Sequence, residues 1–349
     1  MKVKIENFGP VKEFTFDTSK KFNLIVGDNN VGKSYVLNIF YFVVKTFLEM
    51  APLNFRFYMY EEFEPDDESD LEILNEIEVI TNQIKDKKSG SYDITKLWNL
   101  YTKNALQKTY TEIFAKKIKS SYLEQSSIVN SFASSEEAKI TITLENMTLT
   151  IAGDIDNFKV VDASLRDNVV LQLSKQNRTP KVIKNTFKIY AIPTKDPDDI
   201  FENVRHKCFV AVANEILEAT TGVLDIDYLP ASRSGLYQAL SAFGQIIAEL
   251  SKSRSFLSNK IELPGISGQL SDYFIKLTNI ATKGQAVEDF DAIAKSIENN
   301  ILKGAIEYDF DKKRLYYKPK GTDLRLDISS TSSMVSETAP IVTYIRHII

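Results

Sequence analysis

Residues 27–34 read GDNNVGKS and carry the residue types and spacing that hold a phosphate group. Gly27 and Gly32 permit backbone geometry that side chains would block, so consecutive backbone amides can point at one anion. Lys33 would place a positive charge between the β- and γ-phosphates of a nucleotide, and the Ser34 hydroxyl would ligate Mg²⁺. The loop therefore predicts nucleotide binding with Mg²⁺.

The segments on either side of the loop agree with this prediction. The apolar run 22–26 is typical of a buried central strand, and the segment 34–50, apolar nearly all round, predicts a buried helix. A helix that begins near the second glycine directs its positive end at the same anion. The chain has only 13 glycines in 349 residues, which disfavours a chance match. The predicted nucleotide contacts are Gly27, Asn29, Asn30, Val31, Gly32, Lys33, Ser34 and Tyr35.

The composition limits the possible classes of protein. A length of 349 residues suggests two compact units or one domain with a large insertion. The net charge of −4 gives no global basic character, so contact with DNA would need a local patch or a partner. Cys208 is the only cysteine, which excludes intrachain disulfides and fits a reducing compartment. With His206 and His347 as the only histidines, a zinc site of the usual type is disfavoured.

Hydrophobic periodicity predicts the elements that position the loop. The sequence also lacks an apolar run of roughly 18 residues and a signal peptide, so we expect a cytoplasmic protein with no membrane partner. The acidic segment 61–70 is expected to be a solvated loop. Expected strands are 3–5, 11–16, a hairpin at 139–152, 186–193, 223–229 and a hairpin with a further strand within 305–328; expected helices are 71–84, 95–125, 198–219, 235–251, 265–281 and 286–303.

Several residues have simpler structural explanations. Cys208 is expected in the core and both histidines at the surface. The lysine-rich segments 20–23, 115–119 and 311–320 could meet DNA phosphates, but charged surface edges are the commoner explanation.

The loop lies behind NFGP (7–10), and the two together resemble ABC-type ATPase heads of the SMC/RecF group. In particular, they resemble OLD-like and related AAA-family ATPases of bacterial anti-phage defence. YLPASRSGL (228–236) looks like their PAxR motif, and the segment 323–345 is similar to their signature strand, turn and helix. The resemblance covers about residues 1–48 and 220–349.

This resemblance implies an α/β P-loop NTPase fold with an antiparallel N-terminal sheet and a mainly helical insertion. The expected parts are an N-terminal ATPase lobe over 1–50, an insertion over 51–220 with a β-hairpin near 139–152, and a second part of the head over 221–349. It also implies ATP and Mg²⁺ as ligands and a homodimer or higher oligomer formed through the ATP sites.

The signature resemblance implies a second phosphate contact. Ser332, Ser333 and the amides of Met334 and Val335 would face the γ-phosphate held by another subunit. Met334 departs from the family pattern, which has glycine at this position. A helix simply capped by serine is the alternative. Arg233, just before an expected helix, is predicted to form a structural ion pair, with a phosphate contact as the alternative.

ATP hydrolysis in this class needs an apolar strand that ends in Asp-Glu. No four apolar residues followed by Asp-Glu occur in the sequence, so the catalytic residues are unknown. Because the family places this strand after the signature helix, we expect the sequence to be an N-terminal portion of an ATPase. A shortened chain, a natural truncation and a split gene are the alternatives.

The favoured function is an ATP-binding, dimeric ATPase switch that controls a nuclease or toxin in bacterial defence or DNA processing, with DNA as a possible partner. The first alternative is a scaffold that binds ATP without hydrolysing it. A DNA-repair ATPase of the RecF/RecN type is less favoured, because the helical pattern over 71–84 is too short for a coiled-coil arm.

Overall fold

The computed structural model describes residues 1–50, 68–85, 87–122, 127–130, 132, 136–176, 178–193, 197–223, 225–231, 233, 268–278, 280, 288–310, 312 and 314–348. The contacts divide the chain into two compact units, Met1–Ile226 (unit 1) and Asp227–Ile349 (unit 2). The expected division near residue 50 is not a boundary between these units, since residues 1–50 belong to the same unit as most of the expected insertion.

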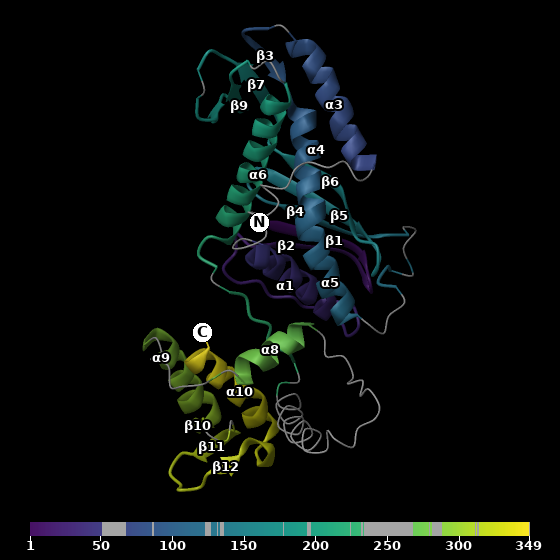
Figure 1. Ribbon diagram of the computed structural model, residues 1–349. Coiled ribbons are helices and arrows are strands. Elements are labelled where there is room, and N and C mark those ends of the chain that lie inside the picture. Colours follow the sequence, from purple (N-terminus) through teal and green to yellow (C-terminus); the bar gives the residue numbers. More distant parts are fainter. Residues whose placement is uncertain are drawn as a thin grey trace, which may run out of the picture. The chain divides into compact units, whose positions relative to one another are not determined.

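The larger sheet of unit 1 is antiparallel and joins the N-terminus to the middle of the sequence (Figure 1). The strands predicted at 3–5 and 11–16 are confirmed, but the pairing of the first of them with residues 138–143 was not predicted. Along the sheet, Val3 lies opposite Ile142, and Ile5 lies opposite Ile140, all of them buried. One face is therefore continuously apolar, as period-two alternation requires. Its strands, in spatial order, are β2 (Val11–Asp17), β1 (Lys2–Phe8), β4 (Ala138–Thr143), β5 (Met147–Gly153) and β6 (Lys159–Leu165).

Helix α1 (Lys33–Met50) begins inside the GKS motif and is mostly buried, as its apolar sequence predicts. It contacts β1, β2 and the short helix α5 (Glu112–Ser121). Helix α4 (Thr95–Leu106) continues through a π-helix, η1 (Gln107–Thr111), into α5. Helices predicted over 95–125 are thus confirmed.

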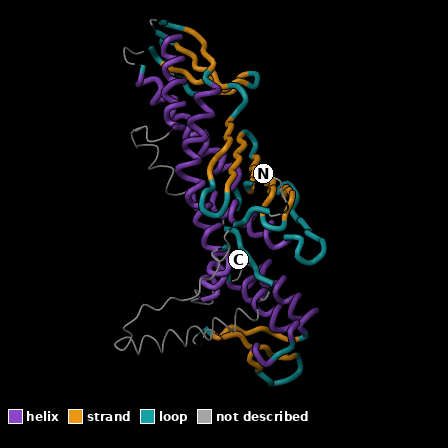
Figure 2. The backbone as a smooth tube through the Cα atoms, turned by 90° about the vertical axis from the view of Figure 1, so that its right-hand side faces the viewer, coloured by secondary structure: helices purple, strands orange, loops and turns teal. Residues whose placement is uncertain are grey.

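A second, smaller sheet lies in the part predicted as a mainly helical insertion, which contains more strands than the expected hairpin. Figure 2 shows the strands of the two sheets as separate groups. Helices α4 and α6 (Asp198–Thr220) pack on this sheet, with the Trp98 and Phe187 ring centroids 5.5 Å apart. The strands, in spatial order, are β3 (Gly90–Asp93), β7 (Val169–Leu173), β9 (Thr186–Ala191) and β8 (Lys181–Ile183).

Helix α3 (Glu68–Ile84) packs on α4 and confirms the helix predicted at 71–84. It begins within the segment expected to be an acidic loop, whose residues 61–67 lie outside the described part of the chain. Cys208 is fully buried in α6, as predicted, and His206 is exposed. His347 is only half-exposed, because its ring packs against Phe310.

Unit 2 is built around the final helix. The ring centroids of Tyr273 and Tyr344 lie 5.7 Å apart in its core, so the last helix packs on the segment that carries Tyr273. The predicted helix at 235–251 lies outside the described residues. The elements are α8 (Gly268–Thr278), α9 (Glu288–Ile297), the π-helix η3 (Glu298–Leu302), β10 (Gly304–Asp309), β11 (Arg314–Pro319), β12 (Leu326–Asp327), the 3₁₀ turn η4 (Ile328–Ser330) and α10 (Ser333–His347).

Two predicted strands are wrong. Residues 22–26 and 223–229 form no strand where they are described. Phe22, Leu24 and Val26 are 79, 73 and 78 % exposed. Among the described strands none pairs with the run 22–26, so its apolar side chains have no sheet to pack within. Hydrophobicity predicted burial there, but burial depends on a neighbouring strand.

Candidate functional site

The loop 27–34 has the backbone geometry that its glycines predict. Gly32 has φ +93° and Asn30 has φ +66°, in the left-handed region that glycine and asparagine tolerate best. Helix α1 begins at the next residue, Lys33, so its first amides have no intrahelical acceptor. The combination of such a turn with a helix N-terminus favours a bound anion.

The Lys33 ammonium group folds back over this loop. Its Nζ atom donates hydrogen bonds to the backbone oxygens of Gly27, at 2.7 Å, and of Asp28. The same side chain lines a cavity of about 540 Å³ together with Pro10, Asn29, Asn30, Gly32, Ser34 and Tyr35. Six of the eight residues predicted to contact a nucleotide therefore meet at one cavity. A lysine, a hydroxyl group and the helix N-terminus fit a phosphate and its cation.

The other two predicted residues lie in the same loop but do not line the cavity. Gly27 accepts the hydrogen bond from Lys33, and Val31 is about half-exposed. Their contribution is to the shape of the loop rather than to the cavity wall. A Cβ atom on Gly27 would lie 3.3 Å from Val31 Cγ2, so this part of the loop is closely packed.

The turn NFGP (7–10) packs directly against the loop 27–34. In the sequence, only the resemblance to ABC-type ATPase heads linked the two segments. A Cβ atom built on Gly32 would lie 2.5 Å from Val11 Cγ2 and 3.1 Å from Pro10 Cγ. On the same side, the Tyr35 ring contacts Gly9 and stacks on Tyr122, with ring centroids 5.4 Å apart. Pro10 and Tyr122 were missed as neighbours of the site, because contacts between distant segments leave no local pattern.

The second predicted phosphate contact lies in unit 2, at the start of α10. Ser332 is the N-cap residue, and its side chain accepts a long hydrogen bond of 3.5 Å from the Val335 amide. Met334 is 60 % exposed, so its side chain packs against little of its own unit. The arrangement is a serine-capped helix N-terminus, which was the alternative explanation of this segment. The phosphate of another subunit as its ligand is implied by the resemblance alone.

The prediction of a structural ion pair at Arg233 is confirmed. Arg233 lies 4.0 Å from the Glu337 carboxylate on α10, measured from Nε to Oε2. Its Nη1 atom donates to the Pro230 carbonyl oxygen at 2.8 Å. Both contacts lie within unit 2, so the PAxR-like turn is attached to the helix that carries the predicted signature.

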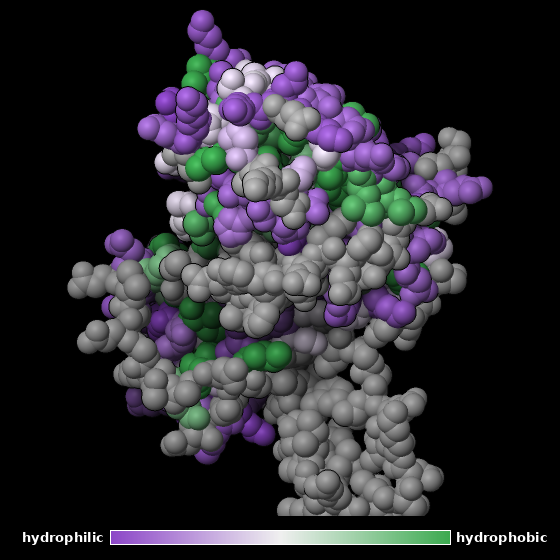
Figure 3. Space-filling model, turned by 45° about the horizontal axis from the view of Figure 1, so that its top comes forward, coloured by the Kyte–Doolittle hydropathy of each residue, from purple (hydrophilic) through white to green (hydrophobic). Residues whose placement is uncertain are grey.

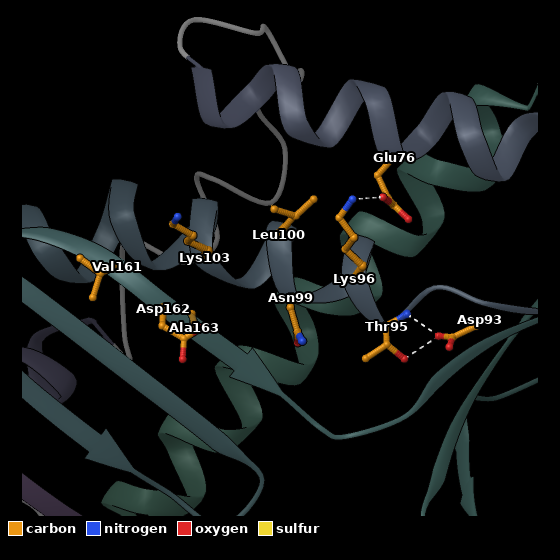
Figure 4. A pocket seen from close by; sticks show the side chains of 10 residues that line it. All are labelled: Glu76, Asp93, Thr95, Lys96, Asn99, Leu100, Lys103, Val161, Asp162 and Ala163. Atoms are coloured by element: carbon orange, nitrogen blue, oxygen red, sulfur yellow. Dashed lines mark hydrogen bonds and ion pairs between the residues drawn. The ribbon is translucent and has the colours of Figure 1, made fainter.

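Another cavity, of about 670 Å³, lies in unit 1 between α3, α4 and β6 (Figure 4). Of the five charged side chains that line it, three have polar partners. Lys96 pairs with Glu76 at 2.5 Å, and Asp93 accepts hydrogen bonds from the amide and hydroxyl of Thr95, which lower the pKa of the Asp93 carboxyl group. No glycine loop lines it, and the amide of Thr95 at the start of α4 already donates to Asp93. The smaller cavity, at the loop 27–34, therefore fits a phosphate group better than this one does.

Two of the lysine-rich segments have partners that support the surface explanation. Lys116, Lys117 and Lys119 pair with Glu112, Glu49 and Asp156. In the hairpin of unit 2, Lys318 pairs with Glu307 at 2.5 Å. Among the described residues, no group of three or more His, Cys, Asp and Glu side chains could hold a metal ion. The described helices also include none with the length and hydrophobicity to span a bilayer.

Comparison with known proteins identifies the family. The model of the AAA ATPase domain matches residues 1–349, the whole of the sequence. No curated protein matches the chain. The family consists of P-loop NTPases that use ATP and typically Mg²⁺, which agrees with the glycine loop, Lys33 and Ser34 at the smaller cavity. This chain is a member of the AAA ATPase domain family.

Proposed function

We propose that this chain is an ATP-binding switch of the ABC type, in which two copies close on ATP. The observation that carries the proposal is the cavity formed by the loop 27–34 and the start of α1, with Lys33 at its wall. A positive charge and free amides at one place bind the β- and γ-phosphates of a nucleotide. The family match supports ATP as that nucleotide.

Each residue of the loop has a separate task. The amides from Asn30 to Ser34 would bind phosphate oxygens, and the Lys33 ammonium would exchange its two carbonyl acceptors for phosphate. The Ser34 hydroxyl, which is exposed, would hold Mg²⁺. When bound, Mg²⁺ neutralises charge on the phosphates. The exposed N-terminus of α10, with Ser332, Ser333 and Met334, would contact the phosphate from another copy.

In this proposal the closed dimer controls a nuclease or toxin in bacterial defence or DNA processing. The support for closure is the resemblance of the α10 segment to the ABC signature and the solvent exposure of Met334. A scaffold that binds ATP without hydrolysing it is the second candidate. Residues 1–349 contain no four apolar residues followed by Asp-Glu, the pair on which hydrolysis in this class depends.

Phosphate release distinguishes the two candidates. Turnover by the wild-type chain that is lost in Lys33→Ala would exclude the scaffold. Stoichiometric binding of ATP without turnover would exclude an autonomous ATPase and leave the scaffold.

The dimer is tested through Ser333. Ser333→Glu places a carboxylate in the first turn of α10, which favours the helix but repels a phosphate. We expect ATP-dependent dimerisation, measured by sedimentation velocity, to be lost in Ser333→Glu and retained in Ser333→Ala. A wild-type chain that binds ATP and stays monomeric would contradict the dimeric switch while leaving ATP binding intact.

A further inference from the structure

One segment of this acidic protein is strongly basic. Residues 168–195 contain six basic side chains and no aspartate or glutamate, although the whole chain has a net charge of −4. The structure folds half of this segment into β7, β8 and β9 of the smaller sheet. We call this sheet, with the residues 87–88 that precede β3, the basic lobe.

The cations of the basic lobe have no carboxylate partners. Seven of them are described, and among the described residues none of the seven takes part in an ion pair. Elsewhere in unit 1, some exposed lysines such as Lys116 and Lys119 have partners, whereas others such as Lys159 have none among the described residues. The unpaired cations of the lobe are Lys87, Lys88, Lys175, Arg178, Lys181, Lys184 and Lys188.

Two of these cations face each other across adjacent strands. Lys181 on β8 is the direct cross-strand partner of Lys188 on β9. Directly opposite side chains lie about 5 Å apart at Cβ, and like charges in such a pair destabilise a sheet. The nearest carboxylate in the same cross-strand row is Asp93, which is two strands further away and bonded to Thr95. The fold therefore keeps a repulsive pair that a polyanion would neutralise.

The strand register places the pair Lys181–Lys188 on the face of the small sheet that is opposite its buried face. Leu171 and Ile189 lie opposite each other on the inner face and are fully buried. Lys188 pairs with Val170 in the next register position, so it belongs to the other face. Arg178 lies over the Tyr190 ring on that face, 5.8 Å from its centroid. Figure 3, which brings this end of unit 1 toward the viewer, shows mostly hydrophilic side chains there.

From this arrangement we propose that the basic lobe binds the phosphate backbone of a nucleic acid. Nucleic acid duplexes carry one negative charge per roughly 1.7 Å of axis, so several neighbouring cations can each contact a phosphate. An isolated acidic side chain could neutralise only one of these cations. Proteins that lie on acidic membranes usually insert the bulky apolar face of an amphipathic helix. The lobe instead presents a sheet, with lysines on an edge strand and one cation stacked on an aromatic ring.

The test is binding of the whole chain to labelled nucleic acids, followed by fluorescence anisotropy at several salt concentrations. The probes are a DNA duplex of about 30 base pairs, the corresponding single strand and an RNA duplex. The lobe variant is Lys175→Glu combined with Lys181→Glu. Its control is Lys159→Glu combined with Lys320→Glu, two exposed lysines outside the lobe that give the same change in net charge.

We expect the lobe variant to bind at least tenfold more weakly than the control in about 100 mM KCl. For duplex DNA, we also expect the lobe variant to show a shallower dependence of log K on log salt. The slope should be smaller in magnitude by about two, since each phosphate contact contributes about 0.9. Whichever probe binds most tightly identifies the class of nucleic acid. Lys181→Glu alone turns the repulsive pair into an attractive one. The melting temperature of this single variant should therefore not fall below that of the wild type. Weaker binding would then not result from unfolding.

Three results would overturn the proposal. The first is no binding of any probe by the wild-type chain in about 50 mM KCl. The second is an equal loss of affinity in the lobe variant and its control, which would show a general effect of charge. The third is binding of phosphatidylserine vesicles in preference to all three nucleic acids. Because the lobe does not include the loop 27–34, Lys33→Ala should leave nucleic acid binding unchanged.

Discussion

The Nε atom of Arg233 donates a hydrogen bond to the backbone oxygen of Glu337, and the Glu337 carboxylate accepts one from the Arg233 amide, both at 3.0 Å. Two residues that are 104 positions apart in the sequence thus exchange main-chain and side-chain contacts. Glu337 lies one turn beyond Ser333, at the start of α10. The turn that contains Arg233 therefore supports the helix whose N-terminus is the proposed phosphate contact.

We expect Arg233→Ala to destabilise unit 2 by about 1–3 kcal/mol, because it removes two side-chain hydrogen bonds worth about 0.5–1.5 kcal/mol each. Arg233→Lys should lose less, since an ammonium group can still reach one carbonyl oxygen. Chemical denaturation measures the stability, and hydrogen exchange of the α10 amides shows where it is lost. Unchanged exchange in α10 in the alanine variant would contradict the supporting role of Arg233.

A second prediction concerns the packing of the loop on the N-terminal turn. Gly32 and Gly222 both have positive φ, +93° and +80°, so alanine strains the backbone at either position. Only at Gly32 would the new Cβ atom also collide, 2.5 Å from Val11 Cγ2. We expect Gly32→Ala to lose at least about 1 kcal/mol more stability than Gly222→Ala and to weaken ATP binding. Equal stability losses, with ATP affinity unchanged in both variants, would show that the turn and the loop are not tightly packed.

A third prediction concerns alkaline pH. Burial raises the pKa of the Cys208 thiol to about 12, although a hydrogen bond with Thr102 opposes the shift. The unfolded chain releases this proton near pH 9, whereas the folded chain keeps it. The stability that depends on the neutral thiol is therefore complete below pH 9 and decreases as pH rises toward 12, by at most about 1.4 kcal/mol per pH unit.

The measurement is urea denaturation of the wild type and Cys208→Ala at pH 8 and at pH 10. The wild type should lose more stability than the variant between the two values. Burial also raises the pKa of Tyr110, which acts in the same direction in both proteins and cancels in the comparison. An equal loss in both proteins would show that Cys208 ionises in the folded state as it does in the unfolded state.

Sequence reasoning was most successful where local pattern decides the structure. The loop 27–34, α1 and the final helix follow from glycine positions, apolar periodicity and a serine cap. It failed where an element depends on a distant partner. The run 22–26 has the composition of a central strand, but among the described strands none pairs with it.

The middle of the chain shows the same limit. The pairing of β1 with β4 joins residues more than 130 positions apart, and no local signal indicates it. In the small sheet β7 pairs directly with β9 in parallel, although β8 lies between them in the sequence and at the edge of the sheet in space. The strand patterns do not indicate this order. The unpaired cations of the basic lobe could have been found in the sequence, since residues 168–195 lack any carboxylate. The cross-strand pair Lys181–Lys188 required the register.

The most direct test of the central claim is calorimetric titration of ATP with Mg²⁺ into the wild-type chain, Lys33→Ala and Lys45→Ala. Lys45 is the matched control, because it lies in the same helix but pairs with Asp225 at 3.1 Å and does not line the cavity. We predict stoichiometric binding by the wild type, affinity at least tenfold weaker in Lys33→Ala from the loss of a charged phosphate contact, and wild-type affinity in Lys45→Ala. Equal affinity in the wild type and Lys33→Ala, or no binding by the wild type, would contradict an ATP site at the loop 27–34.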